Sequence, residues 1–289
     1  MARFIRPGGL SLMLVLAGCV HPAPVTQSSP RGEEYVAMGS SFAAGAGIGP
    51  QQAGSPPRCD RTVNNYASLL AEAEGLALKD VSCGGATTAH ILGAWDELPA
   101  QIEAVSANTR LVTITAGGND LGLVGTLFGG SCRAGVNSFG GPCRSVPAPS
   151  EKDYSALEGR MVEIANEVHR RAPKARIVFV QYVSLLPETR CEKTVIDEGG
   201  AQAARAIARR LAQLTASAAR KGDAELLAAD ALSLAHTPCA SQPWSNGFYA
   251  DYPKTIGAPW HPNAAGHAAI AKTLESLIGQ GKTRTRSAP

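Results

Sequence analysis

The feature that most constrains the fold of this chain is a regular alternation of short apolar runs with longer helical patterns. Most of the runs are β-branched and continuous, which is typical of strands that are covered on both faces. Strands that alternate with helices predict one layered α/β domain, in which helices cover both faces of a parallel sheet. The expected strands are 34–38, 79–83, 110–116, 175–182 and 225–230, and the expected helices are 64–75, 154–172, 198–222 and 263–279.

Length and composition agree with a single domain. The chain has 289 residues, of which 44% are apolar, and no internal shift in composition indicates a second domain. The net charge is only +3, and the lysines and arginines are scattered without interleaved aromatic residues. We therefore expect no nucleic-acid partner.

The first segment has the features of an export signal. Arg3 and Arg6 precede an apolar stretch that is too short to span a bilayer. This stretch ends at residues 16–19 in LAGC, which resembles the bacterial lipobox, where the cysteine is lipidated and becomes the mature N-terminus. We expect export to the bacterial cell envelope and a membrane anchor through lipid on Cys19, which two acyl chains would make stable. An ordinary signal peptide with a chance cysteine is the alternative.

These features divide the chain into four segments. Residues 1–19 are the expected lipoprotein signal peptide, and residues 20–32, which are rich in Pro, Ser and Gly, are the expected flexible tether. Residues 33–281 form the expected folded domain. The basic residues 282–289 are expected to be a disordered tail.

The chain has six further cysteines, an even number that favours disulfides in an exported protein. Zinc is a poor alternative, because no C-x2-C pair exists and no histidine lies at ligand spacing beside a cysteine pair. Six cysteines permit fifteen pairings, and we expect the sequential one because the two in the Gly-rich segment lie close together. The cysteines are Cys59, Cys83, Cys132, Cys143, Cys191 and Cys239.

In a parallel sheet the chemistry is found at the carboxyl ends of the strands. The first expected strand is followed by residues 39–45, GSSFAAG, which place a serine at a tight strand-to-helix turn. Such a serine is also a common helix N-cap. Neither the G-x-S-x-G elbow nor a phosphate-binding P-loop is present, because Ala43 occupies the last elbow position and no G-K-[ST] follows.

Three other segments supply groups that complement a reactive serine. The paired glycines Gly84 and Gly85 follow the second strand and allow backbone amides to approach a ligand. Asn119 follows the third strand, where its amide can donate to an oxyanion, while Asp120 is interpreted as a helix cap. His261 precedes Pro262 at the entrance to the last helix, so its imidazole can point into a cleft. By contrast, His267 lies within the helical pattern and is expected to pack or to cap.

The four segments together resemble the SGNH, or GDSL-type, hydrolase family, in the family's order and over residues 36–267. The resemblance implies a flavodoxin-like three-layer α/β/α sandwich with a five-stranded parallel sheet. By motif position, Ser41 is the nucleophile and His261 the general base, and the Ser41 and Gly85 amides with the Asn119 side chain form the oxyanion hole. The stretch SCGGATT and the six cysteines look most like the disulfide-containing actinobacterial esterase and lipase branch.

Two positions depart from the family pattern. Ser40 stands beside the nucleophile where the family usually has aspartate, so we expect altered local hydrogen bonding with the serine chemistry retained. Ala258 stands three residues before His261, where the family usually places the aspartate of the triad. Some members of the branch use a backbone carbonyl instead, and the Ala258 carbonyl is the expected partner of the imidazole. Asp251 is a less favoured substitute.

The resemblance implies a serine-dependent carboxylic ester hydrolase, an esterase or lipase that needs no metal or cofactor. Its expected partners are ester or lipid-like small molecules, and it is expected to be a monomer. Residues 121–141 are either a Gly-rich loop that lines an acyl pocket or a short helix packed on the core. Two alternatives remain: an acyltransferase that uses the same serine, and a surface lipoprotein that keeps the fold as a binding module, since both aspartate positions are lost.

Overall fold

The structure is a computed structural model, and it describes Met1, residues 32–137 and residues 140–286. Cys19, the other expected signal-peptide residues from 2 onward and the tether through residue 31 therefore lie outside the described residues. The same holds for residues 287–289 of the expected tail. Among the described residues, no helix is both long and apolar enough to cross a membrane.

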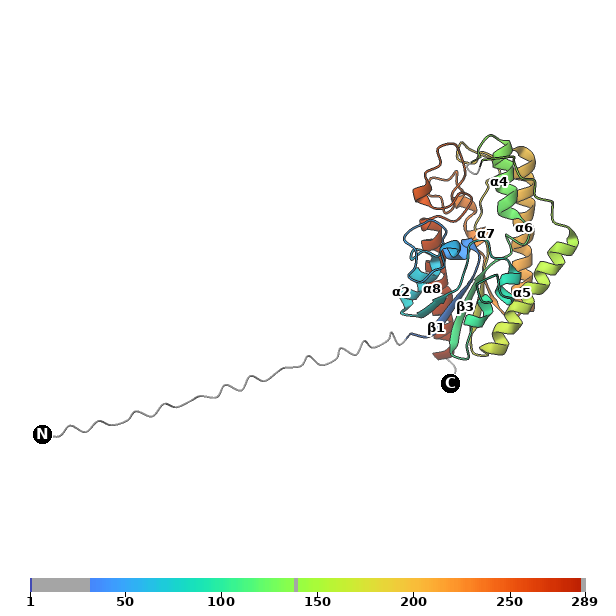
Figure 1. Ribbon diagram of the computed structural model, residues 1–289. Helices are drawn as coiled ribbons and strands as arrows, with labels where there is room; N and C mark the ends of the chain where they lie inside the picture. The colour runs from blue at the N-terminus through green and yellow to red at the C-terminus, as the bar shows by residue number, and fades with distance from the viewer. Residues whose placement is uncertain (2–31, 138–139, 287–289) are drawn as a thin grey trace.

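A five-stranded sheet forms the centre of the molecule (Figure 1). All neighbouring strands are parallel, in the order β2-β1-β3-β4-β5. The chain reverses its direction of strand addition at β1, because β2 lies on one side of it and β3 on the other. The strands are β1 (Glu34–Gly39), β2 (Ala77–Asp80), β3 (Thr109–Thr115), β4 (Arg176–Val180) and β5 (Glu225–Leu227).

Helices cover both faces of this sheet, so the predicted three-layer α/β/α sandwich is confirmed (Figure 1). α2 packs against α8 on one face, while α6 packs against α5 and α4 on the other. The α-helices are α1 (Ser41–Ala44), α2 (Tyr66–Glu74), α3 (Thr88–Leu92), α4 (Leu123–Arg133), α5 (Glu151–Arg171), α6 (Glu198–Lys221), α7 (Ala229–Leu232) and α8 (Ala264–Arg286).

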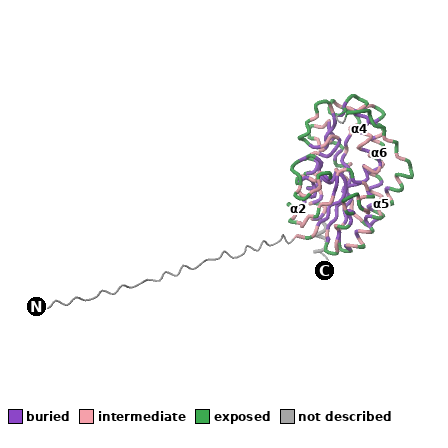
Figure 2. The backbone as a smooth tube through the Cα atoms, viewed as in Figure 1, coloured by how far each residue is buried: buried purple, intermediate pink, exposed green. Residues whose placement is uncertain are grey.

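Buried residues concentrate in the sheet and on the helix segments next to it (Figure 2). Val36, Ile114 and Phe179 are among the buried residues of the three central strands. Their continuous burial explains why these strands have apolar runs rather than alternating patterns. Removing this apolar surface from water is the main favourable term that holds the three layers together.

Several expected boundaries are wrong. β5 ends at Leu227 and not at 230, because residues 229–232 form α7. β4 spans Arg176–Val180 and is shorter than the expected strand 175–182. β2 ends at Asp80 and not at 83, although the amides of Val81 and Cys83 still donate to β1 carbonyls. β1 does not donate back to this segment, because the Gly39 amide donates to the Gln101 side chain at 2.7 Å. At the other end of the chain, α8 extends to Arg286.

The segment 121–141, for which the sequence left two possibilities, contains the helix α4. Leu123 and Leu127 are buried against the core, as expected for a packed helix. Three disulfides join Cys59 to Cys83, Cys132 to Cys143 and Cys191 to Cys239, which is the sequential order expected from the sequence. The second of these ties the end of α4 to the loop that follows it.

Candidate active site

The turn after β1 places two serines at the carboxyl edge of the sheet. Gly39 has φ +142°, and a Cβ atom there would lie 2.2 Å from the Thr115 carbonyl oxygen of β3. Only glycine fits this close approach. Ser40 is then the N-cap of α1, and Ser41 is the first residue of that helix. The helix N-cap that the sequence analysis considered is therefore Ser40, and Ser41 is available for another role.

Ser41 and His261 meet although 220 residues separate them in the chain. The Ser41 Oγ atom lies 2.8 Å from His261 Nε2, and His261 Nδ1 lies 2.7 Å from the Pro259 carbonyl oxygen. Because a carbonyl only accepts hydrogen bonds, Nδ1 carries the hydrogen and Nε2 has a free lone pair. The serine hydroxyl therefore donates to Nε2, which is the arrangement that a general base requires.

The expected role of the Ala258 carbonyl is wrong. That carbonyl accepts a bond from the Asn246 side chain at 3.3 Å, and the Ala258 amide donates to the Ala46 carbonyl at 3.0 Å. Both Ala258 groups therefore hold the loop in place, while the carbonyl of Pro259 orients the imidazole. Asp251, the other candidate, is exposed and is not the partner of His261 Nδ1.

The bond from Pro259 to the imidazole depends on the residue between them. Trp260 has φ +55°, a left-handed conformation that is uncommon for a bulky side chain. Its indole is fully buried and donates from Nε1 to Ser131 of α4 at 3.1 Å. Burial and this hydrogen bond hold the strained turn in place, and the turn brings the Pro259 carbonyl back toward the ring.

The environment of His261 keeps the ring neutral. Only 6% of His261 is exposed, and this burial lowers its pKa below the ordinary value. The bond to the Pro259 carbonyl and the charge of Asp60 raise the pKa, but their effect is smaller. The ring is therefore ready to accept a proton near neutral pH.

Three candidate donors follow the carboxyl ends of β1, β2 and β3. Gly85 is exposed at φ +82°, and the part of the chain that the structure describes holds no acceptor for its amide or for that of Ser41. The Asn119 side chain donates one N–H to the Ala86 carbonyl at 2.9 Å, and its second N–H has no acceptor among the described residues. The structure thus brings Asn119 to the Gly85 segment, as the order of the strands predicts.

Asp120 stabilises this arrangement, but it does not cap the helix that follows it: the N-cap of α4 is Gly122, and Asp120 instead contacts the start of α3. Its carboxylate is 3% exposed and accepts bonds from the Thr88 amide, the first amide of α3. It also accepts from the Thr88 hydroxyl and pairs with Arg160 of α5 at 3.1 Å. The carboxylate therefore holds α3 against the turn that carries Asn119.

The sequence interpretation missed two side chains that hold the Ser41 turn. Gln101 of the 3-10 helix Gln101–Ala104 donates to the Gly39 carbonyl at 3.0 Å, besides accepting from its amide. The Tyr182 hydroxyl lies 2.9 Å from Ser40 Oγ and accepts from the Gly118 amide at 3.1 Å. Tyr182 follows the carboxyl end of β4, so it could have been found by examining the residues after that strand, as was done for the first three strands. No local pattern marks Gln101.

The other four histidines of the described part of the chain have structural roles, and His21 lies outside it. His267 is fully buried, and its Nδ1 atom accepts the Tyr66 amide at the start of α2, so the expected packing and capping role is confirmed. His90, His169 and His236 bond to nearby backbone groups and lie outside the Ser41–His261 pair. Within residues 32–137 and 140–286, no group of three His, Cys, Asp or Glu side chains converges as a metal site would require.

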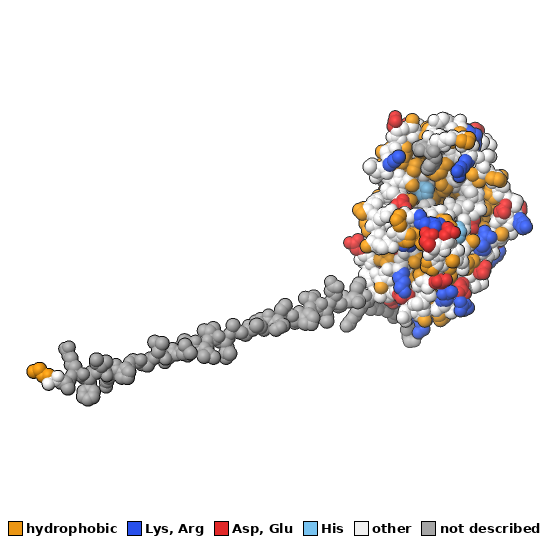
Figure 3. Space-filling model, in the orientation of Figure 1, with side chains coloured by type: hydrophobic (Ala, Val, Ile, Leu, Met, Phe, Trp, Pro, Cys, Tyr) orange, Lys and Arg blue, Asp and Glu red, His pale blue; other side chains and the backbone are white. Residues whose placement is uncertain are grey.

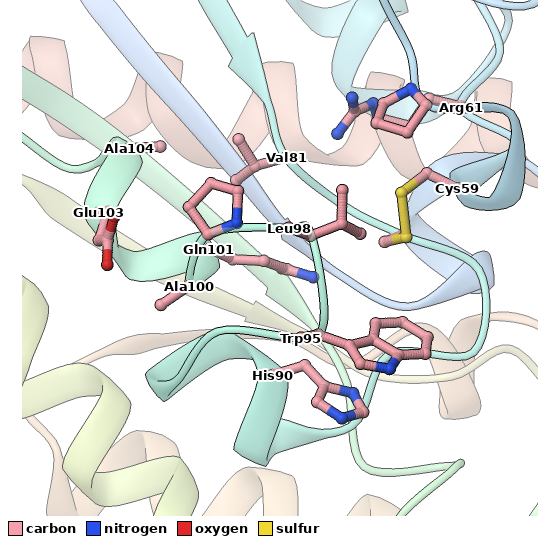
Figure 4. A pocket seen from close by; sticks show the side chains of 13 residues that line it. Cys59, Arg61, Val81, His90, Trp95, Leu98, Ala100, Gln101, Glu103 and Ala104 are labelled. Carbon is pink, nitrogen blue, oxygen red and sulfur yellow. A yellow bond between two sulfur atoms is a disulfide. The ribbon is translucent and has the colours of Figure 1, made fainter.

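The surface around these groups is uneven. A hollow on the face toward the viewer is lined largely by hydrophobic side chains around a histidine (Figure 3). A separate pocket of about 400 Å³ is lined by the Cys59–Cys83 disulfide and by Trp95, on which His90 stacks (Figure 4). The Trp95 ring would be 3.3 Å from a Cβ atom at Gly85, so this pocket lies behind the Gly85 segment.

Comparison with known proteins agrees with this geometry. Residues 37–269 match the model of the GDSL-like Lipase/Acylhydrolase family. The chain is 30% identical to Lipase 2 of Streptomyces coelicolor over 94% of both chains. The fold resembles phospholipase A1 from Streptomyces albidoflavus, with a TM-score of 0.66, 25% identity and coverage of 85% of this chain and 99% of that one.

A second solved structure has the same fold. It is the extracellular lipase from Streptomyces rimosus, with a TM-score of 0.66, 24% identity and coverage of 84% of this chain and 98% of that one. The family match covers most of the chain and includes the Ser41 turn and the His261 loop. The chain therefore belongs to the GDSL-like lipase/acylhydrolase family and is a carboxylic ester hydrolase.

Proposed function

We propose that Ser41 and His261 carry out ester hydrolysis without a carboxylate partner. Ser41 attacks the ester carbonyl while His261 Nε2 takes the hydroxyl proton, and the same imidazole then protonates the leaving alcohol. Water completes the second half by attacking the acyl-enzyme, with His261 again as the base. The Pro259 carbonyl fixes the tautomer and accepts the Nδ1 hydrogen when the ring is charged.

The oxyanion of each tetrahedral intermediate is held by three donors. They are the amides of Ser41 and Gly85, which have no acceptor among the described residues, and the second N–H of the Asn119 side chain. Donors that are fixed before the reaction stabilise the developing charge without reorganisation. The bond from Asn119 to the Ala86 carbonyl supports this proposal, because it holds the side chain beside the Gly85 segment.

The observation that carries the proposal is the 2.8 Å contact between Ser41 Oγ and His261 Nε2. The test is hydrolysis of a short-chain aryl ester by wild type, Ser41→Ala and Ser40→Ala, together with labelling by a fluorophosphonate probe. Ser41→Ala should abolish both turnover and labelling while leaving thermal stability nearly unchanged. Labelling that survives in Ser41→Ala would overturn the assignment.

The same assay tests the two alternatives that the sequence left open. A non-catalytic binding module has no activated serine, so wild type would not react with the probe. An acyltransferase would pass the acyl group to an added alcohol in preference to water, which product analysis detects. The Ser41–His261 hydrogen bond supports catalysis, and the family supports hydrolysis.

The substrate class that we infer is an ester with an apolar acyl chain. The similar proteins are named lipases and a phospholipase A1. A cavity of about 470 Å³ lies beside α4, where Phe128, Pro142 and Val146 supply apolar walls. Trp260 connects α4 to the His261 loop through Ser131. A panel of esters of increasing acyl length tests this class, and a rate that falls steadily beyond acetate would contradict it.

We infer that the protein is located in the cell envelope and is anchored by lipid on Cys19. We also infer that the catalytic domain is a monomer. The three disulfides and the extracellular lipase among the similar structures are consistent with export. Membrane fractionation of wild type and Cys19→Ser tests the anchor, because the variant should appear in the soluble fraction. Sedimentation of the released domain tests the oligomeric state.

A further inference from the structure

The hydroxyl of Tyr182 lies between the two turns that carry the proposed catalytic groups. It is 2.9 Å from Ser40 Oγ, next to the nucleophile, and it accepts from the Gly118 amide at 3.1 Å, next to Asn119. Ser40 is fully buried and Tyr182 is buried, so water does not compete well for these bonds. A single phenol thus joins the turn after β1 to the turn after β3.

The directions of these bonds follow from the chemistry of the groups. Burial raises the pKa of Tyr182 to about 12, so the phenol is neutral at physiological pH. Its oxygen accepts the Gly118 N–H, because an amide nitrogen only donates. The phenol hydrogen is then available to Ser40 Oγ. Ser40 stands where the family usually has aspartate, and its hydroxyl accepts this bond without a buried negative charge.

The ring of Tyr182 adds a second connection. It packs on Phe42 of α1 with ring centroids 4.1 Å apart, and Phe42 packs on His261 with centroids 4.7 Å apart. A Cβ atom at Gly118 would lie 2.6 Å from the Tyr182 ring. The Gly118 turn therefore follows the shape of this ring closely, and no larger residue fits there.

We propose that Tyr182 is a positioning residue for ester hydrolysis, whose hydroxyl holds the Ser41 turn and the Asn119 turn at a fixed separation. The nucleophile and the side-chain oxyanion donor must act on the same carbonyl group, so a small change in that separation weakens transition-state stabilisation. The inference rests on the proposed roles of Ser41 and Asn119. It predicts a loss in kcat with little change in KM, because the ground-state ester needs neither contact.

The experiment compares Tyr182→Phe with Tyr35→Phe on a soluble aryl ester. Both variants remove one buried hydroxyl, and the Tyr35 hydroxyl is 2.7 Å from Thr113 in the middle of the sheet, away from the strand ends. Tyr182→Phe keeps the ring contact with Phe42. We expect its kcat to fall at least tenfold with KM within twofold of wild type, while Tyr35→Phe keeps its kcat. A kcat of Tyr182→Phe within twofold of wild type would overturn the inference.

Ser40→Ala breaks the same connection from the other end and keeps the test decisive if Tyr182→Phe does not fold. Its kcat should also fall at least tenfold. The kcat of the variant with both Tyr182→Phe and Ser40→Ala should be close to that of the less active single variant, because both changes break the same connection. Losses that multiply in the double variant, or a Ser40→Ala kcat within twofold of wild type, would overturn the inference. If wild-type turnover does not depend on Ser41, the proposed function fails instead, so the two failures are distinguishable.

Discussion

In the proposed mechanism, the protonation state of His261 determines when Ser41 is reactive. An imidazolium cannot accept the serine proton, so kcat/KM should rise with pH as the ring loses its proton. Burial lowers the pKa of His261 from 6.5, which moves this rise to lower pH. We expect the midpoint of the acid limb below pH 6.5, measured with an ester that does not ionise in this range. A midpoint above 6.5, or a rate that does not change with pH, would contradict the role of His261.

Asn119 provides a second test on the scale of a single side chain. Asn119→Ala removes one of the proposed oxyanion donors, and loss of such a donor typically lowers the rate by about 10²- to 10³-fold. Asn64→Ala is the matched control, because the Asn64 side chain also donates to a backbone carbonyl, that of Ile48 at 3.1 Å. We expect a large loss of kcat in Asn119→Ala and none in Asn64→Ala. Equal losses would mean that Asn119 has only a structural role.

Among the structural elements, the segment after β2 is the one that a disulfide fixes beside the site. Cys83 lies two residues before Gly85 and is joined to Cys59, and the Gly84 amide donates to the Cys59 carbonyl at 2.9 Å. Replacing both cysteines by alanine should lower the free energy of unfolding by about 3 kcal/mol. It should also lower kcat, because the Gly85 amide is then less well fixed.

The Cys191–Cys239 disulfide is the control for this prediction. It closes a loop of 48 residues, and its removal should lower the free energy of unfolding by a similar amount, about 4 kcal/mol, in denaturant titrations. Because it does not hold an oxyanion donor, the corresponding alanine pair should keep its kcat at temperatures where it is folded. If both double variants lose kcat alike, the proposed role of the first disulfide is wrong.

An element could be predicted from the sequence when residues close to it in the chain determine its conformation, and not when distant residues do. The central strands and the helices α2, α5 and α6 follow from local periodicity, because each buries a continuous run or one apolar stripe. The end of β2 depends on Gln101, which lies 62 residues from the glycine that it contacts, so no local pattern marks it. α4 was ambiguous because its glycines weaken helix propensity, and contacts with α6 decide its conformation.

On the scale of the whole molecule, parallel topology explains why most of the site could be predicted. The carboxyl ends of β1, β2 and β3 lie at one edge of the sheet, and Ser41, Gly85 and Asn119 each follow one of these strands. The partner of His261 could not be predicted in the same way. The Pro259 carbonyl reaches the ring only because Trp260 adopts a left-handed conformation, which burial of its indole stabilises.

The stability of the whole fold should decrease in acid because of His267. This ring is fully buried, and its Nε2 atom has no partner in the part of the chain that the structure describes. Burial, with a smaller effect from His261, lowers the pKa of His267 to about 3, whereas the unfolded chain has the ordinary value of 6.5. Between these values the unfolded state binds a proton that the folded state does not bind. The free energy of unfolding is therefore unaffected by His267 above pH 6.5. Between the two pKa values it falls by about 1.4 kcal/mol for each unit by which the pH decreases.

Replacing His267 by glutamine isolates this contribution. The glutamine side chain keeps an oxygen that can accept the Tyr66 amide, but it does not titrate. Urea unfolding of wild type and His267→Gln between about pH 7 and pH 4 should give a shallower loss of stability in the variant. Other groups titrate in this range in both proteins, so only the difference between the two curves reports on His267. Curves that stay parallel would show that His267 takes up a proton in the folded state as easily as in the unfolded chain, and that the N-terminus of α2 accommodates a charged ring.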